Sequence, residues 1–405
     1  MKNYLVKFLF CFGLAIPGCQ PKPHDPENTQ WRVKGGTADG IQYSALNQIN
    51  KLNVRRLNVA WTYSTHDADT INNRTQIQCN PIIVDGVLYG TSATLAVFAI
   101  DASTGKERWK YKPDSENESL GSNRGVTYWA EGNDKRIFHS FGEFLYALDA
   151  QTGKLISTFG NGGRTSLKEG LGERSAKLMV LSNTPGVIYK NLIIVGSRVH
   201  EGPIAAPGHI RAFDVKTGKL AWVFHTIPLP GEYGYETWPP DAWQKTGGAN
   251  AWSGMTVDEK RGLVFAATGS ASFDFYGGNR KGQNLFANCV LALDALTGKR
   301  KWHFQIIHHD LWDRDLPAAP VLVTMDHNGK KMDAVAQVTK SGYVYLFDRE
   351  TGEPLYPIKE TPVPVSSLEG EEAWKTQPIP VKPPPFTRQV FTESMINPMV
   401  LDAKE

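Results

Sequence analysis

Cysteine is scarce in this sequence, and one-sided charge is absent. The 405 residues contain four cysteines, of which Cys79 and Cys289 lie in neither a C-x-x-C nor a C-x-x-C-H pattern. This excludes a disulfide framework as the basis of the fold and leaves no haem attachment site. Because 44 basic and 41 acidic residues leave a formal net charge of only +3, there is no reason to expect nucleic acid as a partner.

The apolar run at the N-terminus, residues 8–17, is too short to span a membrane comfortably. After a positively charged start, it is typical of a signal peptide. It ends in I-P-G-C, which resembles a bacterial lipobox in which the thiol of Cys19 would carry a diacylglycerol. We therefore predict a lipoprotein signal over residues 1–19, a polar tether over 20–30, and a periplasmic, membrane-anchored protein. An ordinary signal peptide with an incidental cysteine is the alternative.

An internal repeat is the strongest feature of the chain. Five segments share an apolar strand, the turn D-x-x-T-G and, in most of them, a following Trp or other large apolar residue. The glycine of this turn supports positive φ, and the aspartate can accept hydrogen bonds from nearby amides, so each segment is expected to form a β-hairpin. The segments begin at Phe98, Tyr146, Arg211, Leu291 and Tyr345, and their aspartates are Asp101, Asp149, Asp214, Asp294 and Asp348.

The spacing of the repeats predicts an all-β fold, a β-propeller of four-stranded blades with tryptophan-docking repeats. The repeats recur every 48 to 80 residues, and Trp109, Trp222 and Trp302 follow the turn glycine by four residues. With an early strand at residues 57–65, they predict about five or six blades. A Pro-rich stretch over 360–386 follows the last repeat without another. Because first and last blades must close a ring, we expect an incomplete propeller from a longer protein.

Several insertions between the repeats resemble the pyrroloquinoline quinone (PQQ) dependent dehydrogenases, and most closely their membrane-associated, glucose-dehydrogenase-like branch. The resemblance runs from about residue 31 to the end, so residues 31–405 are expected to form the propeller. Members of the family have eight blades. The resemblance rests on TQIQCNPIIVDGVLY from Thr75, RGVTYW from Arg124, NAWSGMTVDEKRGLVF from Asn250 and HHDLWDRDLPA from His308.

The resemblance implies a binding site for PQQ, a planar quinone with three carboxylates. Trp252 in N-A-W-S-G matches the family's floor tryptophan, and Arg124 matches its carboxylate-binding arginine. Thr184 and Ser197 match hydroxyl positions that bind the cofactor, and Gln78 is a weaker match. A core tryptophan and ordinary strand-end residues are the alternatives. The vicinal cysteine pair of alcohol-oxidising members is replaced here by G-S-N, at residues 121–123.

The resemblance also implies the catalytic residues. Asp313 in H-H-D-L-W-D matches the family's general base, and Lys340 in V-T-K-S-G matches the lysine that contacts the quinone. Asp313 would take the hydroxyl proton while hydride passes from carbon to the quinone. Asp310 and Asp315 are close enough in sequence to be confused with Asp313, and a plain turn aspartate is the alternative for it.

A hard divalent cation, Ca²⁺ or Mg²⁺, is the expected Lewis acid. Glu201 and Asp313 are its predicted protein ligands, and Ser270 stands where alcohol-oxidising members have an asparagine. The histidines at 200, 308 and 309 do not have a known metal-site spacing. They either shape a substrate pocket or pack in the interior.

The resemblance implies a dehydrogenase that oxidises a sugar or alcohol and passes electrons to ubiquinone or a cytochrome c. A non-enzymatic scaffold is the main alternative, because the propeller lipoprotein of the bacterial outer-membrane assembly machinery has similar repeats. That lipoprotein has no need of Trp252, Arg124, Asp313 and Lys340 in their matching contexts. A truncated relative that no longer binds cofactor is the third hypothesis.

Overall fold

The computed structural model describes residues 29–113, 121–397 and 399. The predicted lipoprotein signal, with Cys19, lies outside the described residues, as does all of the tether but its last two positions. Among the helices of the described chain, none has the length and apolarity to cross a membrane.

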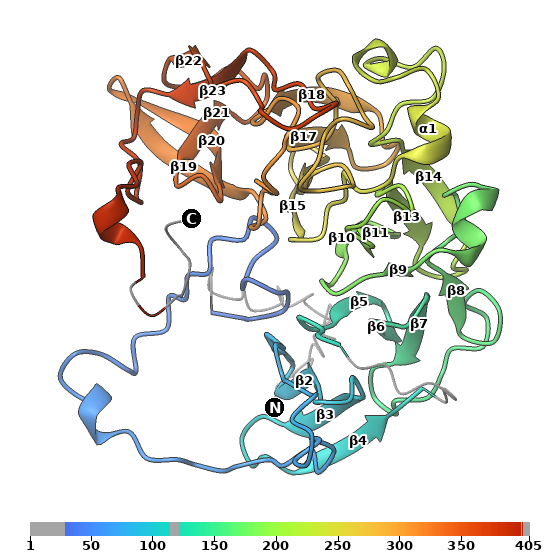
Figure 1. Cartoon of the computed structure of the whole chain (residues 1–405). Helices are drawn as coiled ribbons and strands as arrows, with labels where there is room; N and C mark the ends of the chain where they lie inside the picture. Colours follow the sequence, from blue (N-terminus) through green and yellow to red (C-terminus); the bar gives the residue numbers. More distant parts are fainter. Residues whose placement is uncertain (1–28, 114–120, 398, 400–405) are drawn as a thin grey trace, which may run out of the picture.

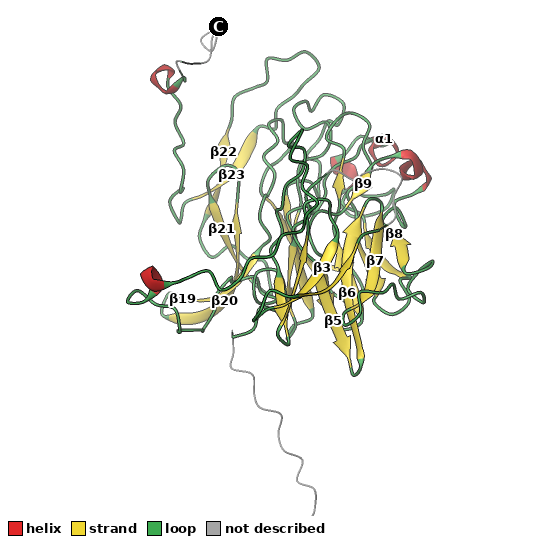
Figure 2. Cartoon of the chain, turned by 90° about the horizontal axis from the view of Figure 1, so that it is seen from below, coloured by secondary structure: helices red, strands yellow, loops and turns green. Residues whose placement is uncertain are grey.

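Antiparallel strands make up nearly all of the regular structure (Figure 2). Among the described residues, four sheets have four strands and a fifth has three, which confirms the all-β propeller and gives five blades. The sheets follow one another in an arc (Figure 1). In chain order they are β1 (Ile82–Val84), β2 (Val87–Thr91), β3 (Val97–Asp101) and β4 (Glu107–Tyr111); β5 (Thr127–Glu131), β6 (Asp134–Phe141), β7 (Phe144–Asp149) and β8 (Arg164–Ser166); β10 (Val187–Tyr189), β11 (Leu192–Val195), β13 (Ile210–Asp214) and β14 (Leu220–Phe224); β15 (Met255–Asp258), β16 (Leu263–Ala267), β17 (Cys289–Asp294) and β18 (Arg300–Gln305); and β19 (Val321–His327), β20 (Lys330–Val338) and β21 (Val344–Asp348).

The remaining elements are short and lie outside the blades. Four short strands form two additional pairs, and the other elements are short helical turns. They are β9 (Val180–Leu181) with β12 (Arg198–Val199), β22 (Ile358–Pro362) with β23 (Thr376–Pro380), the α-helix α1 (Ala242–Lys245), and the 3₁₀ helices η1 (Val54–Arg56), η2 (Glu173–Lys177), η3 (Tyr235–Thr237) and η4 (Glu393–Met395).

The repeated D-x-x-T-G turn is built by its own aspartate. Asp149 Oδ1 accepts hydrogen bonds from the backbone N–H groups of Gln151 and Thr152, at 3.1 and 2.8 Å, and from the Thr152 hydroxyl at 2.7 Å. Gly153 has a φ of +70°, which a residue with a Cβ atom adopts only at a cost. Because all of these bonds are local, the turn is readable from sequence.

The repeated tryptophan docks onto the turn of the next blade. The indole nitrogen of Trp109 donates to Ala150 O at 3.1 Å, in the turn that follows β7. The ring covers Gly153 so closely that a Cβ atom there would stand 2.6 Å from it. The spacing of Trp and Gly in the repeat thus joins one blade to its neighbour. The same contact joins Trp222 to Gly298 and Trp302 to Gly352.

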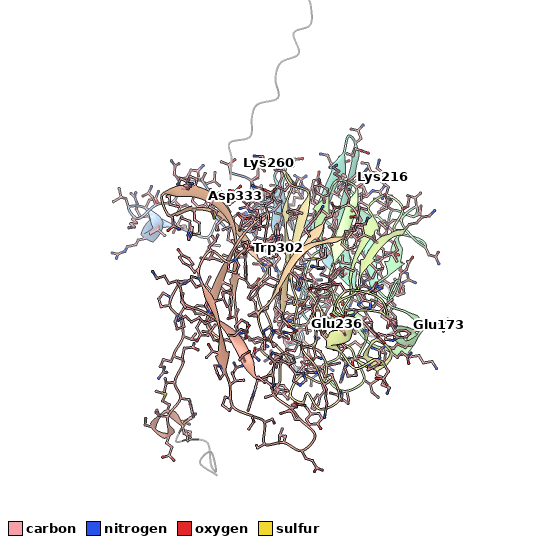
Figure 3. The ribbon with its side chains drawn as sticks, turned by 90° about the horizontal axis from the view of Figure 1, so that it is seen from above. Glu173, Lys216, Glu236, Lys260, Trp302 and Asp333 are labelled. Carbon is pink, nitrogen blue, oxygen red and sulfur yellow. The ribbon has the colours of Figure 1, made fainter. Side chains whose placement is uncertain are left out.

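The hydrophobic core is divided into layers between successive blades. One cluster joins Tyr89 of the first sheet to Ile137 of the second, and another joins Phe265 of the fourth sheet to Phe347 of the fifth. Trp302, which is labelled in Figure 3, belongs to the second of these clusters. The first strands of neighbouring sheets also contact each other, at β5–β10, β10–β15 and β15–β19. The second, third and fourth sheets, which have a neighbouring blade on each side, therefore pack both faces against other blades.

The predicted early strand at residues 57–65 is wrong. These residues belong to no strand, and most of them are exposed. A strand requires a neighbour to satisfy its backbone groups, and no described sheet includes this segment. Trp61 nevertheless docks like the repeated tryptophans, because its indole nitrogen donates to Ala102 O at 3.2 Å and its ring covers Gly105.

The two ends of the propeller differ in construction. Figure 3 shows Lys216, Lys260 and Asp333 at one end, where tight turns join the strands. Glu173 and Glu236, which belong to η2 and η3, lie toward the other end. The insertions therefore extend the end of the blades opposite to the tight turns.

Candidate active site

The predicted site residues come from equivalent places in successive blades. Some precede the first strand of a blade, and others follow the second strand. Because these two strands are antiparallel, both places lie at the same end of the sheet. Arg124, Thr184, Trp252 and Asp313 precede β5, β10, β15 and β19, whereas Ser197 and Lys340 follow β11 and β20.

Backbone hydrogen bonds join the segments that enter the first three blades. The amide of Asn80 donates to Arg124 O at 3.1 Å, and the amide of Arg124 donates to Asn183 O at 2.7 Å. Asn123, which is buried, accepts a hydrogen bond from the amide of Gly125 at 2.8 Å. The backbone on both sides of Arg124 is therefore held in place. Sequence reasoning did not identify Asn123 as a positioning residue.

Arg124, Thr184 and Trp252 form one contact group. The guanidinium carbon of Arg124 lies 5.5 Å from the centroid of the Trp252 ring, within the range of a cation–π interaction. Arg124 also donates to Thr184 Oγ1 at 3.4 Å, and Thr184 Oγ1 donates to Trp252 O at 2.7 Å. Burial and the positive charge of Arg198 lower the pKa of Arg124. Among the described residues, Arg124 has no carboxylate partner, so its charge is available to an anionic ligand.

Trp252, Lys340 and Asp313 meet around Asp315. The indole nitrogen of Trp252 donates to Asp315 Oδ2 at 3.1 Å. Lys340 Nζ lies 3.3 Å from the same oxygen and donates to Asp313 Oδ2 at 2.9 Å. The amide of Ser270 donates to Asp315 Oδ1 at 2.6 Å. Asp315 thus fixes the Trp252 ring and the Lys340 ammonium group relative to each other. Sequence reasoning noted Asp315 only as a neighbour of Asp313 and did not predict this role.

The charges in this group are mutually dependent. Burial raises the pKa of Asp315, and the positive charge of Lys340 opposes that rise. Burial lowers the pKa of Lys340, but its hydrogen bond to Asp313 and the charges of Asp315 and Asp313 outweigh burial and raise it. Lys340 is therefore held in its charged form. Asp313 itself has a φ of +52°, a conformation in which Asp is more common than most residues.

A further carboxyl group, Asp274, lies beside these residues and was not predicted. It is 7% exposed, and its backbone oxygen lies 3.3 Å from the amide nitrogen of Asp313. Burial, followed by the charges of Asp315, Asp313 and Glu201, raises the pKa of Asp274 to about 8. The structure thus brings several carboxyl groups together at this end of the site, and Asp274 is the one that burial and its neighbours keep protonated at neutral pH.

The predicted metal ligands, Glu201 and Asp313, both influence the pKa of Asp274 through their charges. They do not, however, form a compact metal site. Glu201 is exposed, and the described residues contain no group of three His, Cys, Asp or Glu side chains able to hold a metal ion. Ser270, whose role was open, donates its hydroxyl to Asp310. Asn288 donates to the same carboxylate at 3.0 Å, so Asp310 serves this local network.

The histidines are used in local contacts. His308 and His309 are buried. His308 Nδ1 lies 2.9 Å from Gln305 Oε1, and His309 Nδ1 lies 3.0 Å from Asn284 Oδ1. Burial, followed by the charge of Arg280, lowers the pKa of His309 to about 4. For His308 and His309 this environment suits packing in the interior, the second of the two predicted roles, whereas His200 is exposed.

The residues present fit a planar anionic cofactor. Ser197 Oγ is buried and has no hydrogen-bond partner among the described residues, which is costly unless a ligand supplies one. The Trp252 ring is oriented by Asp315, and Arg124 has no carboxylate to neutralise it. Gln78, by contrast, is exposed and contributes no comparable feature.

Lys340 also opens onto a cleft. The cleft has a volume of about 510 Å³, which is within the range of small-molecule sites. Its lining residues are Ile307, Arg314, Lys340, Ser341, Tyr343, Tyr345, Gln377, Ile379, Thr387, Arg388, Gln389, Val390, Phe391 and Met395.

Comparisons with known proteins find related sequences and a similar solved structure. The quinate/shikimate dehydrogenase (quinone) of Acinetobacter baylyi is 35% identical over 402 residues, covering 92% of this chain and 49% of that protein. The quinoprotein glucose dehydrogenase of Escherichia coli is 34% identical over 368 residues, covering 86% and 46%. A solved quinohemoprotein alcohol dehydrogenase from Pseudomonas putida superposes with a TM-score of 0.71 at 28% identity, covering 87% of this chain and 51% of that one.

The chain spans about half the length of these relatives. A family model described as "PQQ: Glucose/ethanol/alcohol dehydrogenase, beta-propeller domain" matches residues 31–405. The predicted family is thereby confirmed. The chain belongs to the PQQ-type glucose, ethanol and alcohol dehydrogenase β-propeller family.

Proposed function

We propose that the protein is a PQQ-dependent dehydrogenase that oxidises a CH–OH group of a sugar or another alcohol. The observation that carries the proposal is that Asp315 contacts both Trp252 Nε1 and Lys340 Nζ, at 3.1 and 3.3 Å, while Lys340 Nζ also donates to Asp313 at 2.9 Å. The relatives support it, since their names describe dehydrogenases of glucose and of quinate or shikimate. Family membership also favours an enzyme over a propeller scaffold.

Several residues of this chain would hold the cofactor. Trp252 offers a flat ring for stacking, and Arg124 a planar cation for a carboxylate. The unpartnered hydroxyl of Ser197 and the Thr184 hydroxyl would hydrogen-bond to its oxygens. When bound, PQQ supplies the quinone that accepts a hydride.

Asp313 would accept a proton, and Lys340 would stabilise negative charge. Asp313 acts as the general base that takes the substrate hydroxyl proton. Its side chain is 28% exposed, so a substrate hydroxyl can approach it. Lys340, held charged by Asp313 and Asp315, would bind quinone oxygens and stabilise negative charge there.

A Ca²⁺ or Mg²⁺ ion is part of the proposal. Glu201 and Asp313 would be its protein ligands, and both lie near enough to Asp274 for their charges to add to the effect of burial in raising its pKa. Because the described protein residues do not form a three-ligand group, cofactor oxygens and water would complete the coordination.

We further propose a periplasmic protein anchored by a lipid on Cys19, with ubiquinone or a cytochrome c as electron acceptor. The I-P-G-C sequence supports the anchor. Acceptor preference is tested by following reduction of a ubiquinone analogue and of cytochrome c side by side; reduction of neither by an enzyme that reduces a dye would contradict this part.

Reconstitution tests the main proposal. The purified protein is incubated with PQQ and either Ca²⁺ or Mg²⁺, and dye reduction is followed with glucose, quinate and simple alcohols. Asp313→Asn should reduce the rate by roughly 10²- to 10⁴-fold, the usual contribution of a general base. Asp326→Asn is the matched control, because Asp326 lies in an exposed ion pair with Lys331 on the β19–β20 hairpin. It should leave the rate unchanged.

The outcomes separate the hypotheses. Substrate-dependent reduction that is lost only in Asp313→Asn supports the dehydrogenase. PQQ binding without turnover would indicate an inactive relative that retains the cofactor site. Absence of PQQ binding to protein shown to be folded by circular dichroism would refute the cofactor proposal and favour the scaffold.

A further inference from the structure

The first described segment crosses the middle of the propeller and carries a lysine into it. Residues 31–39 pair with the first strand of one blade and then with those of two others, and Lys34 lies between these attachments. Figure 1 shows this segment passing between the blades. The amide of Ile83 in β1 donates to Trp31 O at 2.8 Å, that of Val257 in β15 to Ala38 O at 2.8 Å, and that of Leu322 in β19 to Asp39 O at 3.0 Å.

The ammonium group of Lys34 reaches the contact group of Arg124, Thr184 and Trp252. Lys34 Nζ lies 3.7 Å from the point where a Cβ atom of residue 254 would stand, and Thr184 Cγ2 lies 3.1 Å from the same point. Thr184 is the residue that joins Arg124 to the backbone of Trp252. A lysine from the N-terminal segment thus lies beside the proposed cofactor site, although it is 90 residues from Arg124 in sequence.

Lys34 and Arg124 form an uncompensated pair of like charges. Burial, followed by the positive charge of Arg124, lowers the pKa of Lys34 to about 8. Within the described part of the chain, neither side chain forms an ion pair with a carboxylate. Two cations in a partly dry region are costly unless an anion neutralises them. An apolar side chain would avoid that cost if the position served packing alone.

We propose that Lys34 is a second cation of the cofactor site, which binds a carboxylate of PQQ together with Arg124. This inference rests on the proposed function. Its chemical basis is that a ligand with three carboxylates needs several cations, and that Arg124 alone can neutralise only one negative charge. The N-terminal segment is therefore part of the binding site as well as a brace between blades.

The proposal predicts how affinity depends on pH. Arg124 is the charged group that acts on Lys34, and its other identified neighbours, Thr184 and Gly254, carry no charge. Free Lys34 loses its proton as pH rises through about 8, and a bound carboxylate favours the protonated form. Binding therefore takes up a proton, and the affinity for PQQ should fall between pH 7 and pH 9.5.

The test measures PQQ binding in the absence of substrate. Quenching of tryptophan fluorescence and isothermal titration calorimetry give Kd between pH 7 and pH 9.5 for the wild type, Lys34→Met, Lys34→Arg and the control Lys106→Met, whose lysine is exposed. Lys34→Met should weaken binding at pH 7 roughly 10- to 100-fold, the effect of losing a charge-assisted hydrogen bond. It should also flatten the pH dependence. Lys34→Arg should retain most of the affinity, and Lys106→Met all of it.

Melting of the cofactor-free proteins separates binding from structural support. Lys34→Met removes a repulsive charge, so its melting temperature without PQQ should equal or exceed that of the wild type. A lower melting temperature without PQQ would assign Lys34 a supporting role and overturn the proposal. Equal PQQ affinity of Lys34→Met and wild type at every pH would also overturn it while leaving the proposed function intact. A folded wild type that does not bind PQQ would refute both.

Discussion

The docking of each tryptophan onto the glycine of the next blade makes a quantitative prediction for Gly153→Ala. The new Cβ atom would stand 2.6 Å from the Trp109 ring, which is 0.8 Å short of the 3.4 Å at which ordinary contact begins. The ring would have to retreat by that amount, and its 3.1 Å hydrogen bond to Ala150 O would lengthen. Overpacking of this kind costs about 1–3 kcal/mol.

The positive φ of +70° at Gly153 adds a second penalty, of about 1–2 kcal/mol, for any residue with a Cβ atom. The expected loss in the free energy of unfolding is therefore about 2–5 kcal/mol. Gly132→Ala is the matched control, because Gly132 has a φ of +59° and a Cβ atom there would meet nothing within 4 Å. It should lose only the conformational part, about 1–2 kcal/mol.

Urea-induced unfolding followed by far-ultraviolet circular dichroism measures both losses. The double variant Gly153→Ala with Trp109→Leu completes a thermodynamic cycle. In the Trp109→Leu background the alanine should cost no more than it does at Gly132, because the clashing ring is gone. Equal losses for Gly153→Ala and Gly132→Ala, or an absence of coupling in the cycle, would refute the docking argument.

Two further predictions concern the carboxyl cluster and the N-terminus. Asp274 has a pKa raised from 3.8 to about 8, so the folded state holds a proton that the unfolded state releases near pH 4, and the associated stability is lost as pH rises toward 8. Asp274→Asn should therefore gain stability relative to the wild type between pH 5 and pH 8, measured by thermal unfolding in EDTA; a constant difference would contradict the raised pKa. For the proposed lipid anchor, Cys19→Ser should abolish incorporation of labelled palmitate and release the protein from the membrane fraction, whereas labelling that persists in the variant would rule out Cys19 as the anchor.

Within the site, sequence resemblance named residues that the fold brings to one end, and it chose Asp313 as the general base, but it gave no roles to Asp310 and Asp315. Asp310, Asp313 and Asp315 lie within six residues. Asp310 bonds to Ser270 and Asn288, Asp313 bonds to Lys340, and Asp315 bridges Lys340 and Trp252. Which carboxylate faces which partner depends on the backbone path, including the positive φ of Asp313.

The sequence by itself determined the blade repeat, because the bonds that form it are local. The aspartate of each D-x-x-T-G turn binds amides two and three residues ahead, and the glycine is needed one residue later. Strands were harder to predict from the sequence than turns, because a strand also requires a neighbouring strand to pair with. Residues 57–65 have a strand-like pattern but no partner strand among the described residues, so only the docking of Trp61 remains.

Only the tertiary structure decided which distant groups share an environment. Lys34 meets the Arg124 group, and Asp274 meets Asp313 and Asp315, because insertions and the N-terminal segment converge on one end of the blades. No local pattern encodes these approaches. Their effects are electrostatic, and they depend on burial and on distances between charges that the packing of the blades alone establishes.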